Sequence, residues 1–167
     1  GIYLPATEKE YERDILRIKE LGFNLLRKHI KVEPETFYYA CDRLGMLVMQ
    51  DFVNNGPYNF IFDTVIPTYI SKKRNDSKMK LKTKTHDIFI EHSKQLVKHL
   101  YNHPCIIAYT IFNEGWGQFH SDYVYDLVKQ WDSTRLIDST SGWFAQTKNE
   151  FDSEHIYFKQ IDVQVKE

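Results

Sequence analysis

Glu114 is the residue in this sequence whose setting is best suited to chemistry. With Asn113 before it, it directly follows an eight-residue apolar run, Cys105 to Phe112. If that run is a buried strand, the carboxylate stands on a rigid element at the edge of a sheet, with a hydrogen-bonding amide beside it. A carboxylic acid held in this way can protonate the leaving oxygen of a glycoside, while a second carboxylate about 5 Å away attacks the anomeric carbon. The competing interpretation is that Asn-Glu-Gly is only a polar turn after a strand.

The segments around Glu114 alternate between helical and extended patterns. Thr7 and Glu10 have the spacing of a capping box, and apolar residues then recur at helical spacing, which predicts a helix over residues 7–21. Similar signals predict three more helices: Pro34 to Gly45, Thr85 to Pro104, and one around residues 124–131. Short apolar runs predict strands at residues 23–30, 46–52, 105–112, 136–140 and 155–158, with a further short one at residues 2–4.

Strands that alternate with helices favour right-handed β-α-β units and a parallel sheet, either open and doubly wound or closed into an eight-stranded barrel. Polar residues favour the barrel, because they gather where successive predicted strands end, as in an enzyme barrel. No glycine-rich nucleotide-binding loop supports the open sheet. We therefore expect an α/β fold, a (β/α)8 TIM barrel. A complete barrel takes about 250 residues, so this chain of 167 residues is expected to hold about strands 1–6 and to lack the last strand-helix units.

Four blocks of sequence carry a family resemblance. They are GFNLLRKH at residues 22–29, FYYACDRLGMLVMQD at residues 37–51, IFNEGWG at residues 111–117 and RLIDSTSGW at residues 135–143. In order and approximate spacing they resemble the catalytic barrel of glycoside hydrolase family 2, which β-galactosidases, β-glucuronidases and β-mannosidases share, and the resemblance covers nearly the whole chain. It implies that Glu114 is the acid/base, that Asn113 contacts the sugar, and that the reaction retains configuration through a covalent glycosyl-enzyme.

The chain departs from the family pattern in two places. The family often has Arg-x-x-His, whereas here the histidine follows Arg27 one position earlier, as His29. His29 is therefore either a sugar ligand or a histidine that hydrogen-bonds neighbouring strand ends. The second departure is the nucleophile, which in the family is a glutamate near the end of the seventh strand. Glu150, Glu154 and Glu167 do not match that motif, so we expect the nucleophile beyond the C-terminus of this sequence.

Five more residues near predicted strand ends complete the candidate site. Asp51 either accepts hydrogen bonds from sugar hydroxyls or forms an ion pair that orients Arg27, which we interpret as a structural organiser of the strand ends. Trp143 either presents its ring to the apolar face of a sugar or packs in the core. His155 and Tyr157 alternate onto one side of a predicted strand, toward the site of an intact barrel, with ordinary inward packing as the alternative.

One basic cluster suggests another class of function. Residues 71–84 contain seven cations and one acid, a pattern typical of a phosphate-binding patch or of a solvated loop. A net charge of −1 gives no general attraction to nucleic acid, and the few aromatics nearby do not interleave with the cluster. We therefore favour the solvated loop. The aromatic-rich residues 54–70 before it are expected to shape the rim of the substrate cleft.

Cysteine usage and hydropathy narrow the class further. Cys41 and Cys105 each lie in an apolar stretch without a metal-type pair, which predicts reduced core thiols. No window approaches the roughly 18 apolar residues of a membrane span. We expect a cytoplasmic protein, with secretion left open because the start of the sequence need not be the start of the protein.

These observations predict one domain over residues 1–167, part of a retaining β-glycosidase that acts on terminal β-linked sugars in the manner of a β-galactosidase. No motif requires a cofactor or supplies a metal site, and the fragment alone is expected to be inactive. A barrel remnant that binds carbohydrate without cleaving it is the alternative, and a nucleic-acid-binding protein is a second rival that depends on the basic cluster alone. An incomplete barrel leaves unpaired sheet edges, so self-association is also expected.

Overall fold

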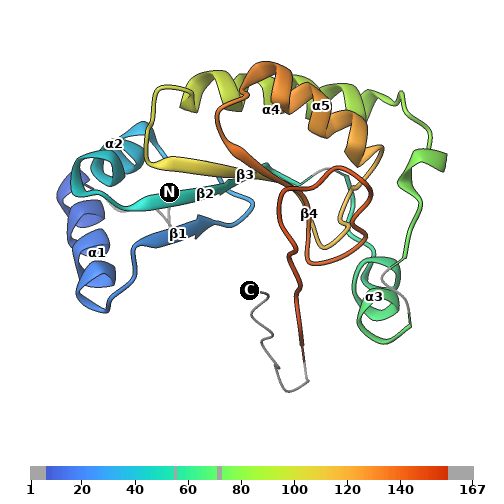
Figure 1. The fold of residues 1–167 in the computed structure, drawn as a ribbon, viewed down its shortest axis with the longest axis horizontal. Helices are drawn as coiled ribbons and strands as arrows, with labels where there is room; N and C mark the ends of the chain where they lie inside the picture. The colour runs from blue at the N-terminus through green and yellow to red at the C-terminus, as the bar shows by residue number, and fades with distance from the viewer. Residues whose placement is uncertain (1–6, 55, 71–72, 158–167) are drawn as a thin grey trace.

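The computed structural model describes residues 7–54, 56–70 and 73–157, and its centre is a parallel sheet (Figure 1). The sheet consists of β1 (Leu25–Lys28), β2 (Leu47–Asp51), β3 (Ile106–Asn113) and β4 (Leu136–Ser141), in the order β1-β2-β3-β4. The longer helices are α1 (Glu8–Glu20), α2 (Glu35–Leu44), α4 (Lys84–Leu100) and α5 (Ser121–Trp131). Figure 1 shows these four helices along one side of the curved sheet.

This strand order distinguishes the two sheets that the sequence allows. A doubly wound sheet carries helices on both faces and reverses its strand order at a switch point. Here each strand pairs with the next one in the sequence, all pairs are parallel, and the helices lie on one side. The described residues therefore form an arc of a barrel wall, as expected for a truncated (β/α)8 barrel.

Local signals fix most element boundaries. The backbone N–H of Thr7 donates to Glu10 Oε2 at 3.0 Å, which confirms the capping box at the start of α1. Gly45 ends α2 in the left-handed conformation, with φ of 67°. The predicted cap of α4 was wrong by two residues, because Thr83 is extended and its Oγ1 accepts from the His86 N–H at 3.1 Å.

Two further predictions differ from the structure. The helix α4 ends at Leu100 and not at Pro104: a turn follows, closed by the His103 N–H donating to the Leu100 carbonyl at 3.1 Å, and the proline disfavours a helical His103. Residues 155–157 form no strand, while residues 2–4 and 158 lie outside the described residues. Side chains, and not a further strand, bind the outer edge of β4. The N–H groups of Ile137 and Ser139 donate to the side chains of Glu150 and Asn149, at 2.6 and 2.8 Å.

The hydrophobic core lies between the helices and the sheet. It includes both cysteines, which are buried free thiols, as predicted. At the carboxyl end of β3, Phe112 is 1% exposed and its ring centroid lies 5.3 Å from that of Phe89 and 5.6 Å from that of Phe119. Buried aromatic pairs of this kind are stabilising and geometrically specific, so the strand end that carries Asn113 is firmly anchored.

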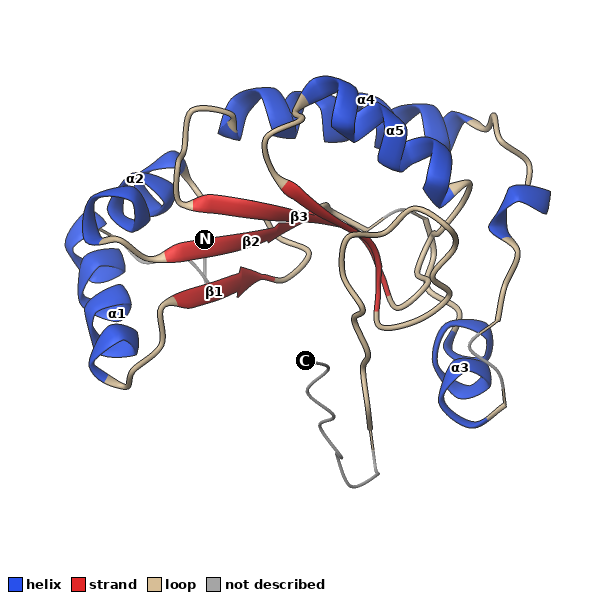
Figure 2. Cartoon of the chain, in the orientation of Figure 1, coloured by secondary structure: helices blue, strands red, loops and turns tan. Residues whose placement is uncertain are grey.

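The connection between β2 and α4 contains short helical turns, a π-helix at Ile61–Val65, α3 at Ile66–Tyr69 and a 3-10 turn at Asp76–Lys78. Figure 2 shows α3 and the neighbouring loops beyond the carboxyl ends of the strands, where a rim is expected. Within the described ranges, no helix combines the length and apolar character needed to cross a lipid bilayer.

Candidate functional site

A bidentate ion pair between Arg27 and Asp51 lies at the centre of the strand ends. The guanidinium of Arg27, on β1, donates through Nε and Nη2 to the two carboxylate oxygens of Asp51, on β2, both at 2.9 Å. Asp51 also accepts from His29 Nδ1 at 3.0 Å and from the backbone N–H of Ile30 at 3.2 Å. Asp51 is 1% exposed, so its charge is buried and satisfied by protein donors.

Arg27 extends this network to β3 and to the segment after β4. Its Nη2 donates to Asn113 Oδ1 at 2.9 Å, and its Nη1 lies 3.3 Å from His155 Nε2. A guanidinium has only donors, so His155 Nε2 accepts and the ring proton lies on Nδ1. Arg27 thus joins four segments, and its role as an organiser of the strand ends stays a prediction.

Glu114 stands directly after β3 in a tight turn with an unusual backbone conformation. Its φ is 53° and that of Gly115 is 72°. The turn is closed by the Trp116 N–H donating to the Asn113 carbonyl at 3.0 Å, and the Glu114 N–H donates to the carbonyl of Ser141 on β4 at 3.0 Å. A left-handed conformation costs a non-glycine residue about 1–2 kcal/mol, and such strain persists only where neighbouring contacts hold it.

The carboxylate of Glu114 is held by two side chains of the irregular segment after β4. Oε1 accepts from His155 Nδ1 at 2.6 Å and from the Tyr157 hydroxyl at 2.5 Å. The hydroxyl of Ser141 lies 3.1 Å from His155 Nε2 and fixes the other side of the ring. The structure therefore brings the two residues of the predicted last strand to Glu114, although they are not in a strand.

These contacts set the protonation of the site. Burial by itself raises the pKa of Glu114, but the hydrogen bonds from His155 and Tyr157, with the nearby imidazoles, outweigh burial and hold that pKa below its ordinary value. The same contact has the opposite effect on its phenol partner. The hydrogen bond to Glu114, followed by burial, raises the pKa of Tyr157 to about 12.

Seven of the eight predicted site residues thus form one connected cluster: Arg27, His29, Asp51, Asn113, Glu114, His155 and Tyr157. Trp143 lies beside it, with its ring edge-to-face against Tyr157 at a centroid distance of 6.2 Å. Trp143 is only 2% exposed, and its indole N–H has no hydrogen-bond partner among the described residues. In this structure the ring packs inside the site wall and does not present a face to solvent.

The structure adds Asp138, which the sequence analysis missed. Asp138 lies on β4, is 2% exposed, and accepts from the Ser153 hydroxyl at 3.1 Å. Burial raises its pKa, against the lowering effects of its hydrogen bonds and of the Arg27 charge. The available signal was an acidic residue within a predicted buried strand, because an aspartate is rarely buried unless it is paired.

The basic cluster at residues 71–84 is more than a solvated loop, which corrects the earlier interpretation for two of its residues. Lys73, Lys78 and the lysines at 80, 82 and 84 are exposed, as expected. Asp76, in contrast, is 2% exposed and accepts from Gln118 Nε2 at 2.8 Å and from the Ser121 N–H at 2.9 Å. Arg74 is also folded into the structure, against the turn that carries Glu114.

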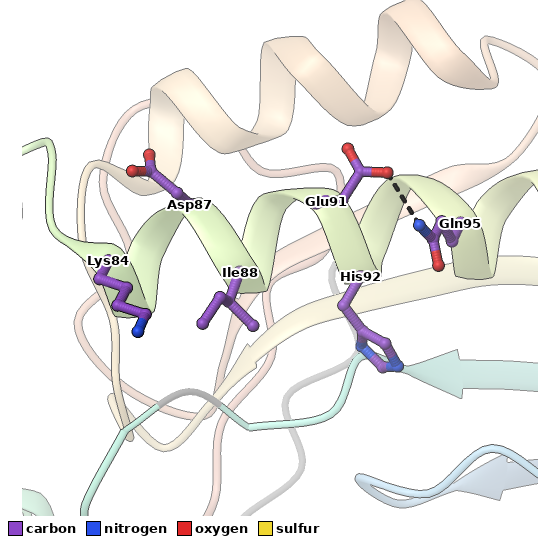
Figure 3. Close-up of a pocket in the computed structure, with 6 residues that line it drawn as sticks. All are labelled: Lys84, Asp87, Ile88, Glu91, His92 and Gln95. Carbon is purple, nitrogen blue, oxygen red and sulfur yellow. Dashed lines mark hydrogen bonds between the residues drawn. The ribbon is translucent and has the colours of Figure 1, made fainter.

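The surface has other hollows, one of which borders the cluster because Arg27 is among its lining residues. Figure 3 shows another along α4, lined by Lys84, Asp87, Ile88, Glu91, His92 and Gln95, where Glu91 accepts from Gln95 at 2.9 Å. Its residues form a stripe of one helix with mixed charges and include none of the cluster around Glu114. Among the residues that the structure describes, no group of three or more His, Cys, Asp or Glu side chains is arranged to hold a metal ion.

Comparison with known proteins identifies the family. Residues 6–165 match the model of the glycosyl hydrolases family 2 TIM barrel domain. A β-galactosidase of Aeromonas hydrophila subsp. hydrophila is 31% identical over 139 residues, which is 82% of this chain and 12% of that enzyme. A β-galactosidase of Priestia megaterium is 22% identical over 161 residues, 95% of this chain and 15% of that enzyme. The chain thus spans a small part of the curated relatives that it matches.

Solved structures show the same fold. The β-galacturonidase from Eisenbergiella tayi, bound to galacturonate, superimposes with a TM-score of 0.56 at 22% identity, over 84% of this chain and 22% of that one. The β-D-glucuronidase of Dictyoglomus thermophilum gives a TM-score of 0.56 at 18% identity, over 78% of this chain and 22% of that one. Because the family model covers nearly the entire sequence and the strand order is that of a barrel wall, this chain belongs to glycosyl hydrolase family 2 and forms part of the family's TIM barrel domain.

Proposed function

We propose that this chain supplies the acid/base half of a retaining β-glycosidase site that acts on terminal β-linked sugars. The observation that carries the proposal is the position of Glu114. It stands at the carboxyl end of β3, with its carboxylate held by His155 and Tyr157 and with Asn113 beside it in the Arg27 network. In a retaining mechanism one carboxyl group first protonates the leaving oxygen and then deprotonates the attacking water.

The low pKa of Glu114 suits the second of these two steps. An ionised carboxylate is the form that accepts a proton from water, and the donors on His155 and Tyr157 favour that form. The first step needs the protonated form. A second carboxylate about 5 Å away would supply it, since a like charge raises the pKa of its neighbour. That charge disappears once the nucleophile is esterified by the sugar, so Glu114 would then become a base.

The second carboxylate is expected outside this sequence. Within the described part of the chain, the side chains that hydrogen-bond Glu114 are a histidine and a phenol, neither of them an acid that can attack a sugar. The β-galactosidase of Aeromonas hydrophila subsp. hydrophila is also much longer than this chain, which covers 12% of it. We therefore expect the 167-residue chain alone to bind sugar weakly at most, and to show no turnover.

The sugar is proposed to be a β-galactoside, because the curated relatives are named β-galactosidases. A uronide is the second candidate, since the solved neighbours include a β-galacturonidase and a β-glucuronidase. Arg27 is the arginine of the cluster, and its Nε, Nη1 and Nη2 atoms already face Asp51, His155 and Asn113, so each of its nitrogens has a partner other than the carboxylate of a uronide. This leaves the neutral sugar as the better fit.

The test uses the full-length protein that contains this chain and its Glu114→Ala variant. With disaccharides, which have poor leaving groups, the variant should lose about 10²- to 10⁴-fold in rate, the usual contribution of a positioned acid. With an activated aryl β-glycoside it should still form the glycosyl-enzyme, and azide should accelerate the second step in place of the lost base. Cleavage of disaccharides by the variant at the wild-type rate would show that Glu114 is not the acid/base.

A carbohydrate-binding function without catalysis is tested by the same material. If the full-length protein binds a β-galactoside but cleaves neither disaccharides nor aryl glycosides, the proposal of an enzyme is wrong. For the isolated chain, the Glu114→Gln variant serves as the control for contaminating enzyme. Turnover by the chain that is absent from this variant would contradict the expectation that a second carboxylate is required.

A further inference from the structure

Arg74 lies against the turn that carries Glu114, although it belongs to the basic cluster between β2 and α4. Its Nη1 donates to the carbonyl of Gly115 at 3.2 Å, and its Nη2 donates to the carbonyl of Phe62 at 3.2 Å. The guanidinium carbon lies 4.1 Å from the centroid of the Phe144 ring. One side chain therefore contacts the loops after β2, β3 and β4.

The guanidinium of Arg74 is partly buried, and its contacts fix its orientation. The side chain is 25% exposed, and its Nη2 forms an ion pair with Asp63 Oδ1 at 3.6 Å. The planar fork of an arginine can donate to two carbonyls while its face stacks on an aromatic ring, which a lysine cannot do. Such an arrangement fixes the orientation of Arg74 and, through it, the carbonyl of Gly115.

The ring of Phe144, which lies against the guanidinium of Arg74, also approaches the turn closely. A Cβ placed on Gly115 would lie 2.3 Å from Phe144 Cδ2, so glycine is required for the approach of Phe144. The backbone around Phe144 is held by Gln118 and Gln146, whose Nε2 atoms donate to its carbonyl at 3.0 and 2.7 Å. Gln146 Nε2 also donates to the backbone carbonyl of Arg74 at 2.6 Å.

We propose that Arg74 is a positioning residue for the acid/base: it holds the left-handed turn at Glu114 and Gly115 in place by fixing the Gly115 carbonyl between the loops after β2 and β4. The role follows from geometry, because the φ values of 53° and 72° in this turn need outside contacts to persist. The inference extends the proposed function, and its catalytic meaning rests on that function.

The main test measures the turn itself and does not require activity. In the 167-residue chain, hydrogen exchange of the Trp116 amide, which closes the turn on Asn113, is compared among wild type, Arg74→Gln and Arg74→Lys. A second readout follows the ¹³C-labelled carboxyl of Glu114 through a pH titration, assigned with Glu114→Gln. Arg74→Lys keeps a positive charge near Asp63 and so separates the effect of charge from that of the fork.

A matched control is Arg135→Gln at the opposite end of the sheet. Arg135 is also mostly buried and donates to backbone carbonyls, of Ile106 at 3.0 Å and of His103 at 3.0 Å, beside the buried Asp132. Within the described part of the chain, Arg135 forms no hydrogen bond or ion pair with the turn at Glu114 and Gly115. Its loss should therefore destabilise the chain without changing Glu114.

Both Arg74 variants should exchange the Trp116 amide at least about tenfold faster, because the turn opens locally. In both, the pKa of Glu114 should rise toward its ordinary value, and neither change should occur in Arg135→Gln. In the full-length enzyme, kcat for a disaccharide should fall about 10- to 100-fold, the scale expected for a misplaced acid.

Unchanged exchange and an unchanged titration in Arg74→Gln would overturn the proposal, as would wild-type behaviour of Arg74→Lys or an equal response of Arg135→Gln. If the Arg74 variants show none of these effects while Glu114→Ala still loses cleavage of disaccharides, the role of Arg74 is rejected and the proposed function stands.

Discussion

Replacing Gly142 by alanine is a direct test of how Glu114 is held. Gly142 follows β4 with φ of 85°, and a Cβ at this position would lie 2.5 Å from Cγ of His155. That separation is too short for two carbons, so the imidazole has to move. When it moves, the carboxylate of Glu114 loses the hydrogen bond from His155 Nδ1, which is 2.6 Å long.

The expected cost has two parts. The positive φ costs an alanine about 1–2 kcal/mol, whatever the space around it. Loss of a hydrogen bond to a charged group costs about 1.5–3 kcal/mol more, and the side chains of Glu114 and His155 are only 22% and 20% exposed, so water replaces the bond incompletely. Gly142→Ala should therefore destabilise the chain by about 2.5–5 kcal/mol. Gly22→Ala is the matched control, because Gly22 has φ of 90° and nothing within 4 Å of the added Cβ, so it should cost about 1–2 kcal/mol.

Urea unfolding at two pH values separates the two parts. A carboxyl group whose pKa is lowered by folding contributes stability above its unfolded pKa, near 4.3, and loses that contribution as the pH falls through the folded pKa. The difference between Gly142→Ala and Gly22→Ala should thus be large at pH 7 and should shrink as Glu114 is protonated. Equal destabilisation by the two variants at pH 7 would refute the reasoning. A difference that stays constant down to low pH would show that the ring clash matters, and not the hydrogen bond.

Three more predictions concern the same region. Arg27→Met should destabilise the chain by about 3–5 kcal/mol in urea unfolding, because it leaves the carboxylate of Asp51, 1% exposed, without its bidentate partner, while the double substitution with Asp51→Leu should recover much of the loss. Tyr157, whose pKa is raised to about 12, should stabilise the chain below pH 10 and lose this contribution as the pH rises to about 12; an alkaline absorbance titration in which the phenol missing from Tyr157→Phe ionises near pH 10 would contradict it. Phe112→Ala should cost about 3–5 kcal/mol by thermal or urea unfolding, since it empties the aromatic cluster under the turn of Glu114, and a cost below about 1 kcal/mol would mean that the cluster does not anchor β3.

The four long helices and the strands up to residue 141 follow from local information, whereas the short helical turns between β2 and α4 were not predicted. Apolar periodicity located α1, α2, α4 and α5, and caps such as Thr7 and Gly45 set their ends within a residue or two. The error at α4 shows the limit of such signals. Thr83 and Thr85 are equally good caps by type, and only the extended backbone at Thr83 decides between them.

The part of the site at the strand ends could be predicted, whereas Arg74 on the loop before α4 could not; His155 and Tyr157 were predicted near the site, but as residues of a strand. Arg27, Asp51 and Asn113 meet because parallel strands bring their carboxyl ends to one edge, which the sequence order already implies. Arg74 is separated from Gly115 by 41 positions, and neither residue has a pattern that points to the other. The predicted strand is absent over residues 155–157 for a related reason: the N–H groups of Ile137 and Ser139 on β4 are satisfied by the side chains of Glu150 and Asn149, so the next segment is not drawn into the sheet.

The two steps of the proposed reaction depend on different parts of the protein. The base form of Glu114 is favoured by His155 and Tyr157, which reach it from an irregular segment that is held by side chains such as Ser153, whose hydroxyl accepts from the Gly142 N–H at 3.2 Å. The acid form needs a nearby negative charge, which this chain does not place beside Glu114 within its described residues. A substitution in residues 151–157 should therefore affect hydrolysis of the glycosyl-enzyme more than its formation, while removal of the second carboxylate should affect formation first. Burst kinetics with an activated aryl β-glycoside separate the two rates, and a His155→Ala variant that slows formation more than hydrolysis would contradict this division of roles.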